Sequence, residues 1–446
     1  MRRLLLAGAA VLTAAAAAIA VALPASAETA AFTVVSSWSN GYQGQVAVTN
    51  NTSSTITTWR VELTFPAGTT VAQSWNATQS GTVFTPAGWN GTLSPGASTS
   101  FGFIANGSGR PTACRINGVS CDGSTPPPTT PPVTTPPPTG STPVAINGQL
   151  RVCGVHLCNS SGQAIQLKGM STHGIQWFAD CYNDASLDAL ATDWQADLLR
   201  VSMYVQEQGY ETNPSGFTSR VNSLVDEASE RGLYAIIDFH TLTPGDPNYN
   251  LANAKTFFAN VSARNAAKPN VIYEITNEPN GVSWSGIKSY AEQVIPVIRA
   301  NDPDAVIIVG TRAWSSLGVS EGSSSSEITA NPVNASNIMY AFHFYAASHK
   351  DNYRAEVQRA AASLPLFVTE FGTVTATGGG AVDLASTATW LDLLDRLQIS
   401  YANWTYSDAD ESSAAFRPGT CGGPTYAGTG VLTESGTYLR NRIRNS

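Results

Sequence analysis

Residues 124–143 constrain the fold of this chain more than any other segment. They read Ser-Thr-Pro-Pro-Pro-Thr-Thr-Pro-Pro-Val-Thr-Thr-Pro-Pro-Pro-Thr-Gly-Ser-Thr-Pro, with no charge and almost no apolar side chain. Such a composition cannot build a core, and its proline density favours an extended, semi-rigid spacer rather than a structured loop. We therefore predict two separate domains, residues 28–123 and 144–446, each long enough to bury its own core.

The N-terminus has the organisation of a secretory signal peptide. Two arginines precede an apolar, alanine-rich run over residues 4–23, and the small residues 25–27 offer a cleavage site. A membrane anchor is the alternative, because the run is long enough to span a bilayer, but no charged stop-transfer segment follows it. We predict that the signal peptide, residues 1–27, is removed, that the mature chain begins at Glu28, and that the protein is secreted.

The charge balance limits the possible partners. The chain has 24 basic and 32 acidic residues, and losing Arg2 and Arg3 leaves 22 basic residues, a net charge near −10. This excess argues against nucleic acid or an anionic membrane as a partner. Only 13% of residues are charged, so uncharged polar side chains carry the surface, which suits a neutral polar ligand. We expect a monomer with no cofactor, no nucleic acid and no membrane partner.

Six cysteines in an exported chain indicate disulfides. The pairs that the spacing suggests are Cys114–Cys121, Cys153–Cys158 and, by what remains, Cys181–Cys421. Other connectivities stay open, because six cysteines can pair in many ways. None of the six sits in a Cys/His cluster with metal-ligand spacing, so we expect no metal site.

The first domain is strand-like throughout. Apolar and polar residues alternate over residues 45–49, 59–65 and 99–104, and clusters of Gly, Asn and Pro separate these segments. Short strands with regular turn signals predict an all-β sandwich. Residues 28–123 contain no Lys, no His and no paired acids, so the domain is better suited to binding than to catalysis.

Four tryptophans of the first domain divide into two kinds. Trp59 sits inside an apolar strand and is expected in the core, whereas Trp38, Trp75 and Trp89 sit in polar turns. Three aromatic rings in polar loops predict a stacking platform for a flat ligand.

These motifs resemble a family 2 carbohydrate-binding module of the cellulose-binding type over roughly residues 28–123. The resemblance implies a planar binding face made of Trp38, Trp75 and Trp89, with Asn76 and Asn90 as polar neighbours. Such modules usually join a cysteine in the first strand to one near the end. The first strand here has none, so Cys114 stands in as the partner of Cys121.

The second domain alternates strands with helical patterns. Val221, Leu224, Val225 and Ala228 have helical spacing, and Gly232 ends that helix. The expected strands are Ile165–Met170, Leu198–Val205, Tyr234–Phe239, Val271–Glu278, Val306–Gly310, Ile338–Phe344, Leu366–Glu370 and Tyr401–Tyr406. Eight strands with intervening helices predict an α/β fold, a (β/α)8 TIM barrel.

Polar residues gather at the ends of these strands, where barrels keep their chemistry. They are His173, Arg200, His240, Asn277, Glu278, His343, Tyr345, Glu370 and Trp404. A single one of these histidines would more often be a core residue, but three of the chain's five fall at this mouth. The concentration of polar groups predicts an active site there.

Two carboxylates at one barrel mouth suit glycoside hydrolysis. Arg200 is available to stabilise an ionised Glu370, which makes Glu370 the expected nucleophile. Glu278 would then protonate the leaving oxygen and later act as base. In a retaining enzyme the two carboxyls should lie about 5 Å apart. Asn277 is placed to hold the sugar hydroxyl next to the reacting carbon.

Other assignments of these residues are weaker. Glu274 and Glu278 are expected on the same side of one strand, with Glu274 lower in the barrel. We interpret Glu274 and Asp238 as structural residues. A Ser/His/Asp hydrolase would need a Gly-x-Ser-x-Gly elbow, and a zinc hydrolase would need a His-Glu-x-x-His motif. The chain contains neither motif.

Five motifs carry a resemblance to glycoside hydrolase family 5, most of all to its bacterial endoglucanases. They are Asp-Leu-Leu-Arg200-Val, Asp-Phe-His240, Ile-Tyr-Glu-Ile-Thr-Asn277-Glu278-Pro, Ala-Phe-His343-Phe-Tyr345 and Phe-Val-Thr-Glu370-Phe-Gly. The resemblance covers nearly all of residues 144–446. It implies a (β/α)8 barrel and retaining cleavage, with Glu278 as acid/base and Glu370 as nucleophile.

The same resemblance implies roles for the neighbouring residues. Arg200 and Tyr345 would hydrogen-bond the nucleophile, His343 would neighbour the acid, and His240 with Asn277 would line the adjoining sugar subsite. The substrate-binding residues that it implies are His173, Trp177 and Trp404. Related enzymes often carry a Lys where this chain has Ala409, so contacts to the non-reducing side differ here.

We consider three functions. The first is a secreted endo-β-1,4-glucanase that binds cellulose through its first domain. The second keeps the mechanism but acts on mannan, xylan or mixed-linkage β-glucan, which the barrel and two glutamates cannot distinguish. The third is a glycan-binding protein without catalysis, which a missing catalytic carboxylate would indicate, and both carboxylates are present.

Overall fold

The computed structural model describes residues 28–121, apart from positions 39, 53, 67, 108 and 118, and residues 142–444. The predicted signal peptide, residues 122–123 and residues 124–141 of the predicted linker lie outside the described residues. The chain divides into two compact units, whose described parts are these two ranges. No helix in the described ranges is long and apolar enough to cross a membrane.

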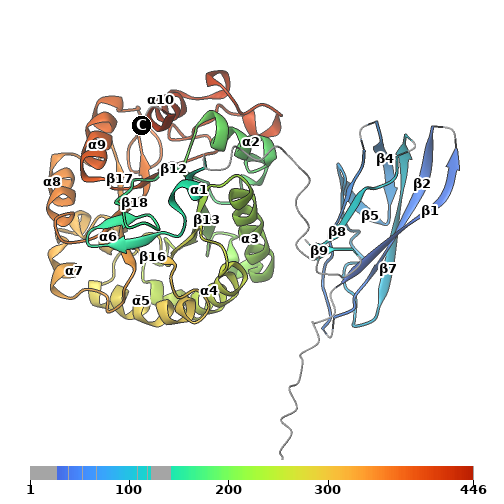
Figure 1. The fold of residues 1–446 in the computed structure, drawn as a ribbon, viewed down its shortest axis with the longest axis horizontal. Helices are drawn as coiled ribbons and strands as arrows, with labels where there is room; N and C mark the ends of the chain where they lie inside the picture. Colours follow the sequence, from blue (N-terminus) through green and yellow to red (C-terminus); the bar gives the residue numbers. More distant parts are fainter. Residues whose placement is uncertain are drawn as a thin grey trace, which may run out of the picture. The chain divides into compact units, whose positions relative to one another are not determined.

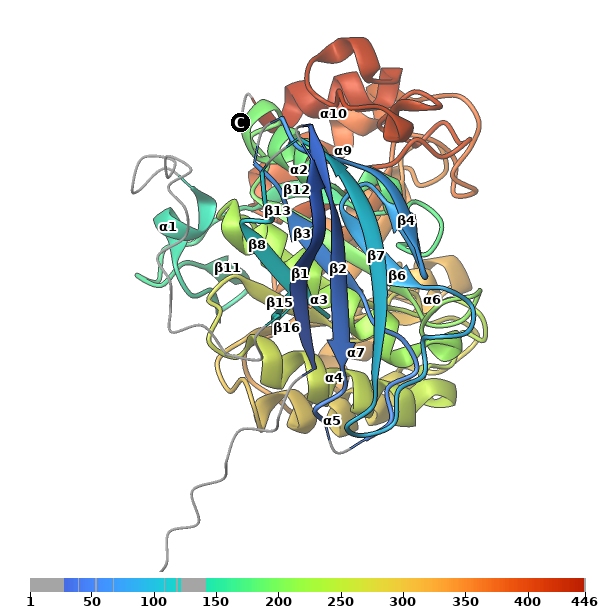
Figure 2. The same cartoon turned by 90° about the vertical axis from the view of Figure 1, so that its right-hand side faces the viewer.

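The first unit is a β-sandwich, as the sequence predicts. One sheet has the strand order β1-β2-β7-β4, and Figure 2 shows these strands side by side. The other sheet has the order β5-β6-β3-β8-β9. The strands are β1 Thr29–Trp38, β2 Gly41–Thr49, β3 Val61–Thr64, β4 Thr70–Trp75, β5 Ala77–Ser80, β6 Val83–Pro86, β7 Ser98–Asn106, β8 Ala113–Ile116 and β9 Val119–Ser120.

The sandwich core is aromatic. Trp59 is fully buried and stacks on Phe101 with ring centroids 5.5 Å apart, which confirms its predicted place in the core. Its indole N–H donates to the carbonyl of Asn90, so the buried polar group has a partner. Cys114 and Cys121 form a disulfide on the strand pair that ends this unit.

The second unit is a closed barrel of eight parallel strands surrounded by helices (Figure 1). The strands are β12 Lys168–Ser171, β13 Leu198–Tyr204, β14 Tyr234–His240, β15 Val271–Glu274, β16 Val306–Val309, β17 Ile338–Tyr345, β18 Leu366–Gly372 and β19 Tyr401–Trp404. β12 pairs with β19 and closes the ring. The predicted (β/α)8 fold is therefore correct.

The helices follow the strands in the order expected for this fold. They are α1 Pro143–Asn147, α2 Asp184–Asp188, α3 Pro214–Glu230, α4 Leu251–Asn265, α5 Trp284–Arg299, α6 Arg312–Ser315, α7 Ser326–Ala330, α8 Asp351–Ala360, α9 Leu384–Leu397 and α10 Glu434–Arg444. α1 begins at Pro143, the last residue of the predicted linker. Thr142 caps this helix and a proline suits its first turn.

The barrel interior is layered. Alternate strand residues point inward, so Leu198, Ile236 and Ile272 fill an apolar layer near the N-terminal ends of the strands. Two positions further along, the next inward layer is charged and consists of Arg200, Asp238 and Glu274, all fully buried. The outward residues between them pack on the helices. This alternation delivers charge to the C-terminal mouth.

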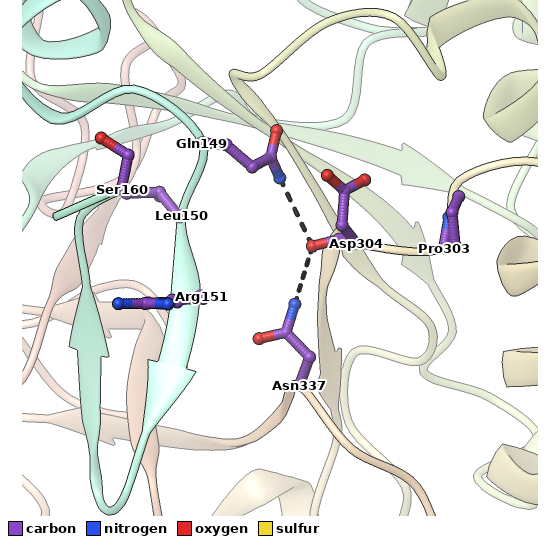
Figure 3. Close-up of a pocket in the computed structure, with 7 residues that line it drawn as sticks. All are labelled: Gln149, Leu150, Arg151, Ser160, Pro303, Asp304 and Asn337. Carbon is purple, nitrogen blue, oxygen red and sulfur yellow. Dashed lines mark hydrogen bonds between the residues drawn. The ribbon is translucent and has the colours of Figure 1, made fainter. Parts of the chain in front are cut away.

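A hairpin covers the other end of the barrel. It consists of β10 Arg151–Cys153 and β11 His156–Cys158, which the disulfide Cys153–Cys158 joins. A hollow lies beside it, where Gln149 and Asn337 both donate to the carbonyl of Asp304 (Figure 3). Asp304 and Asn337 precede β16 and β17, so this hollow is at the end opposite the predicted active site.

The third predicted disulfide also forms. Cys181 and Cys421 join the segment after β12 to the segment after β19. The Asp408 carboxylate accepts hydrogen bonds from the backbone N–H groups of Gly419 and Cys421. Two loops at the C-terminal mouth are thereby fixed to each other.

Seven of the eight predicted strand starts agree with the structure, seven of the eight strand ends differ by one or two residues, and the two remaining boundaries differ more. β12 begins at Lys168, three residues after the predicted start, and β15 ends at Glu274, four residues before the predicted end at Glu278. The β15 ladder ends with Glu274 opposite Asp238 on β14 and Ile308 on β16, although β14 continues to His240. Asn277 and Glu278 therefore lie in the loop beyond the strand.

Candidate active site

Arg200 is the centre of the mouth. Its guanidinium is fully buried, with Nε 2.7 Å from Glu274 and one terminal nitrogen 3.2 Å from Glu370. The other terminal nitrogen donates to the Asn277 side-chain oxygen at 2.7 Å and lies 2.9 Å from Asp238. A planar fork with several donors suits this multiple role. Glu274 and Asp238 thus hold the arginine, as the structural interpretation predicts.

Glu370 is held at both of its oxygens. Arg200 reaches one oxygen, and the Tyr345 hydroxyl donates to the other at 2.8 Å. Glu370 lies within β18 rather than at its end, so its backbone is fixed by the sheet, and the residue is 5% exposed. The arrangement presents a rigid, charged carboxylate to the mouth.

Glu278 faces a histidine instead of an arginine. The His343 Nδ1 lies 2.9 Å from a Glu278 oxygen, and the other ring nitrogen lies 2.8 Å from the Thr369 hydroxyl. Thr369 donates to Glu274 at 2.6 Å, so its oxygen accepts the His343 Nε2–H. This chain of hydrogen bonds directs Nδ1 toward Glu278.

The two carboxyls have opposite electrostatic environments. Burial raises the pKa of Glu278, and the charge of Glu370 adds to the rise, although the hydrogen bond with His343 opposes it. Burial alone would raise the pKa of Glu370, but the positive charges of His343 and Arg200 outweigh it and the net shift is downward. Burial lowers the pKa of His343, but Glu370, Glu274 and Glu278 reverse this and raise it to about 9.

The two carboxyls are close together. An oxygen of Glu278, a ring nitrogen of His343 and an oxygen of Glu370 lie within 4.8 Å of one another. Retaining glycosidases place their carboxyl groups about 5–5.5 Å apart, and inverting ones about 6.5–9.5 Å apart. The observed separation is closer to the first range than to the second.

Two clusters among the described residues have the composition of a metal site. One is the set Glu278, His343 and Glu370, whose charges Arg200 and the hydrogen bonds above already balance. The other contains Asp408 with Cys181 and Cys421, whose sulfurs are joined to each other.

His240 and Asn277 form a neutral edge of the site. Nδ1 of His240 lies 2.6 Å from Asp238, and Nε2 lies 3.2 Å from the Asn277 amide nitrogen. Because Arg200 donates to the Asn277 oxygen, the amide N–H is directed at His240. Burial and Arg200 lower the pKa of His240 to about 3, so the ring is neutral. The structure places both residues at the mouth, beside Arg200.

Aromatic rings form the next part of the mouth. His173 lies 4.8 Å from Trp404 and 5.9 Å from Trp177, measured between ring centroids. Trp177 is 41% exposed, whereas Trp404 is almost covered and its indole N–H donates to Glu411 at 3.2 Å. The structure therefore brings all three predicted substrate-binding residues together.

The sequence analysis missed two residues of this wall. The Tyr204 ring stacks on His240 at 4.1 Å and contacts Trp177, and it lies four residues after Arg200 on β13. Strand alternation could have found it, because both residues point inward. Glu411 follows Ala409 in an irregular loop, and no periodicity indicates its position.

On the other side of Glu278, α6 carries an exposed ring. Trp314 is 43% exposed, and its backbone N–H donates to the Pro279 carbonyl at 3.0 Å. An apolar ring next to the loop of Glu278 offers a stacking surface opposite the Trp177 side. No sequence pattern had indicated this residue.

On the sandwich, Trp38 and Trp75 share one face. A Cβ atom on Gly41 would lie 3.0 Å from the Trp38 ring, and one on Gly102 would lie 2.3 Å from the Trp75 ring, so both rings lie over glycines. Gly41 pairs with Asn106, four residues from Gly102 on β7, which puts both glycines on one side of the sheet.

That side faces away from the core, because Phe101 and Phe103 on β7 point the other way and are buried. The same register places Gln43, Gln45 and Gln73 on the outer face, where the sequence analysis had not noted them. The outer face is therefore polar and aromatic, as a surface for a flat sugar chain should be.

The predicted turn positions of the tryptophans need correction. Trp38 and Trp75 are the last residues of β1 and β4, and only Trp89 lies in a loop. Trp89 is 72% exposed, and its neighbour Asn90 donates to the Asn76 carbonyl next to Trp75. Trp75 is half-buried because it lies flat over Gly102.

Comparison with known proteins agrees with this geometry. Residues 158–410, more than half of the chain, match the family described as Cellulase (glycosyl hydrolase family 5). The chain belongs to glycosyl hydrolase family 5. Residues 28–121 match the family described as Cellulose binding domain, so this family 5 enzyme also carries a carbohydrate-binding module.

Bacterial relatives match both units of the family 5 enzyme. Endoglucanase CelA of Streptomyces lividans is 64% identical, over 93% of this chain and 91% of that protein. Endoglucanase E-5 of Thermobifida fusca is 58% identical, over 94% of this chain and 92% of that protein.

A solved structure matches the barrel unit. The crystal structure of the catalytic domain of Thermobifida fusca endoglucanase Cel5A (E5) is 60% identical, with a TM-score of 0.68, over 68% of this chain and 99% of that one. A variant of that domain in complex with cellotetraose matches with a TM-score of 0.67.

Proposed function

We propose that this family 5 enzyme is a secreted, retaining endo-β-1,4-glucanase that cleaves internal bonds of cellulose by double displacement. Glu370 is the nucleophile and Glu278 is the acid/base. The relatives named endoglucanase support the activity. The separation of the two carboxyls, with oxygens within 4.8 Å of each other, is the observation that carries the mechanism.

In the first step, an oxygen of the Glu370 carboxylate attacks the anomeric carbon. The bond from that carbon to the leaving sugar's oxygen breaks, and the Glu278 carboxyl gives its proton to this oxygen. Arg200 and Tyr345 hold Glu370 ionised and aligned for the attack. Asn277 is placed to bind the hydroxyl beside the anomeric carbon, a contact that strengthens as charge develops.

In the second step, the Glu278 carboxylate takes a proton from a water molecule. The water oxygen bonds to the anomeric carbon, and the bond to Glu370 breaks and returns a carboxylate. The protonated His343 keeps its Nδ1–H directed at Glu278 in both states, because an oxygen of the carboxylate or of the carboxylic acid can accept it. The product keeps the configuration of the substrate.

The substrate chain would lie across the mouth. Trp177, Tyr204 and Trp404 would contact sugars on one side of the cut, and Trp314 would contact the leaving half on the other. Ala409 leaves the first side without the lysine that related enzymes often carry. Glu411 is the charged group that this loop does supply, next to Trp404.

A panel of polysaccharides tests the activity. Initial rates on carboxymethylcellulose, mannan, xylan and mixed-linkage β-glucan should be highest on the β-1,4-glucan. Viscosity should fall well before many reducing ends form, because internal cuts shorten the chain fastest. A higher rate on mannan or xylan would replace cellulose as the substrate, and no hydrolysis of any β-glucan would leave a binding protein only.

We further propose that the outer face with Trp38 and Trp75 binds cellulose and raises the enzyme's local concentration at an insoluble surface. Deleting residues 28–143 should lower activity on crystalline cellulose far more than on soluble carboxymethylcellulose. The double variant Trp38→Ala and Trp75→Ala should reproduce the deletion, whereas Trp59→Phe, in the core, tests packing alone. Equal losses on both substrates would contradict the proposal.

Secretion and a monomeric state complete the proposal. The signal-like N-terminus and three disulfides favour an oxidising compartment outside the cell. Sequencing of the protein from culture medium should start at Glu28, and light scattering should give one chain. A start at Met1 in a membrane fraction would contradict secretion.

A further inference from the structure

One segment at the mouth has an unusual backbone. Ala313, Trp314, Ser315 and Leu317 have φ values of 62°, 58°, 53° and 58°. L-residues other than Gly disfavour this left-handed region, and a run of them is rare. Strained conformations of this kind persist only where the surroundings fix them, and they gather at functional sites. We call residues 311–318, which include α6, the left-handed turn.

The left-handed turn contacts the backbone on both sides of Glu278. The Ser315 hydroxyl donates to the Asn277 carbonyl at 2.6 Å, and the Trp314 N–H donates to the Pro279 carbonyl at 3.0 Å. These two carbonyls belong to the residues directly before and after Glu278. The turn therefore fixes the short piece of chain that carries this carboxyl.

A third contact extends the hold. The Glu321 carboxylate accepts the Gly281 N–H at 2.9 Å and pairs with Arg312 Nε at 2.9 Å. Arg312 is part of the left-handed turn and also reaches Glu327. The segment of residues 311–321 thus contacts residues 277, 279 and 281.

The left-handed turn is itself tied to the strand of His343. The Thr311 hydroxyl donates to the Ala341 carbonyl on β17 at 3.0 Å and accepts the Leu317 N–H at 3.1 Å. The Thr311 N–H donates to the Ser315 hydroxyl. The buried Ser315 hydroxyl therefore links the left-handed turn to the Asn277 carbonyl. The backbone of Glu278 and its partner His343 therefore share one support.

This support replaces what the sheet does not provide. β15 ends at Glu274, so no strand ladder holds Glu278. Its own backbone N–H donates to the Thr241 carbonyl at 3.2 Å, and its carbonyl accepts the Asn280 side-chain amide at 2.9 Å. Gly310 permits the close approach, because a Cβ atom there would lie 2.3 Å from the Thr276 carbonyl oxygen. Only glycine fits between the end of β16 and this loop.

We propose that Ser315 is a positioning residue for the acid/base, and that the left-handed turn sets the place of the Glu278 carboxyl relative to the leaving oxygen. The inference rests on the proposed role of Glu278. A small displacement of Glu278 should impair proton transfer while Glu370, fixed within β18, still attacks.

The choice of leaving group distinguishes an effect on proton transfer from an effect on nucleophilic attack. Phenyl β-cellobioside needs protonation of its leaving oxygen, and dinitrophenyl β-cellobioside does not. kcat/KM reports the cleavage step alone, so Ser315→Ala should lower it about 10-fold or more on the phenyl substrate and less than about 2-fold on the dinitrophenyl substrate. A purely structural role would lower both equally, and that result would overturn the proposal.

Two controls make the result specific. Ser262→Ala removes a fully buried hydroxyl on α4 that accepts a hydrogen bond from Asn301. This variant should leave kcat/KM unchanged on both substrates. Glu278→Gln should show the same selectivity more strongly. If Glu278→Gln lowers kcat/KM equally on both substrates, the proposed function fails. If only Ser315→Ala lowers kcat/KM equally on both, the positioning role of Ser315 fails and the proposed function stands.

A second variant covers a failure of Ser315→Ala to fold. Glu321→Ala removes the acceptor of the Gly281 N–H from a partly exposed site and keeps the buried serine. It should also lower kcat/KM more on the phenyl substrate than on the dinitrophenyl substrate, with a smaller decrease than Ser315→Ala. Unchanged kinetics on both substrates would then contradict the proposal.

Discussion

The two halves of the catalytic mouth hold their carboxyls in different ways. Glu370 lies inside β18, where the sheet fixes its backbone and Arg200 and Tyr345 fix both oxygens. Glu278 lies in a loop four residues past the end of β15, with His343 at one oxygen and hydrogen bonds from neighbouring segments along its backbone.

The difference matches the two roles that we propose for these carboxyls. A nucleophile must stay ionised and aligned, which suits a strand and an arginine whose charge does not change. An acid/base must gain and lose a proton, which suits a buried carboxyl whose pKa is raised and which contacts a histidine rather than an arginine. Opposed environments push two pKa values apart and thereby assign the two roles.

The largest effect should follow from loss of the nucleophile. Glu370→Gln keeps the size of the side chain but removes the attacking charge, so kcat/KM should fall by more than about 10⁴-fold. Unlike Ser315→Ala, it should fall by a similar factor on phenyl and dinitrophenyl β-cellobioside, because cleavage of either substrate needs the attacking carboxylate. The melting temperature checks that the variant is folded. A Glu370→Gln enzyme with substantial activity would show that the nucleophile is elsewhere.

A smaller effect should follow from loosening the same carboxylate. Tyr345→Phe removes one hydrogen bond to a charged oxygen, worth about 2 kcal/mol, so kcat/KM should fall about 30-fold. That hydrogen bond also lowers the pKa of Glu370, so the acid limb of the pH profile should move to higher pH. Tyr353→Phe, on α8, is the control with unchanged kinetics. An acid limb that stays in place would contradict the role of the tyrosine.

The smallest effect at the optimum should come from His343→Asn. Loss of one hydrogen bond to Glu278, about 1 kcal/mol, should lower kcat/KM about 5-fold. The protonated ring lowers the pKa of Glu370, so removing it should raise that pKa and move the acid limb to higher pH. Activity would then be lost sooner as pH falls. A limb that moves to lower pH would mean that His343 is neutral in the working enzyme.

The sequence predicted most of the nucleophile half. Arg200, Tyr345 and Glu370 lie on strands, and strand alternation together with the rule that barrels work at their C-terminal ends placed them correctly. Tyr204 obeys the same alternation and could have been included. A local sequence pattern is enough to predict the position of a residue that lies on a regular strand.

The acid/base half was harder to predict. The run before Glu278 continues the strand pattern, but the strand stops at Glu274, although β14 beside it continues to His240. The left-handed turn contains Ala313, Trp314 and Ser315 where a positive φ would suggest glycine. Its conformation comes from tertiary hydrogen bonds, which no local signal encodes.

The anomeric configuration of the first product tests the central claim most directly. Cellotetraose mixed with the enzyme can be followed by proton NMR before the product's anomers equilibrate. Two close carboxyls acting as nucleophile and acid/base predict the β-anomer first, with retention of configuration. An α-anomer formed first would mean direct attack by water, and it would contradict the assignment of Glu370 as the nucleophile.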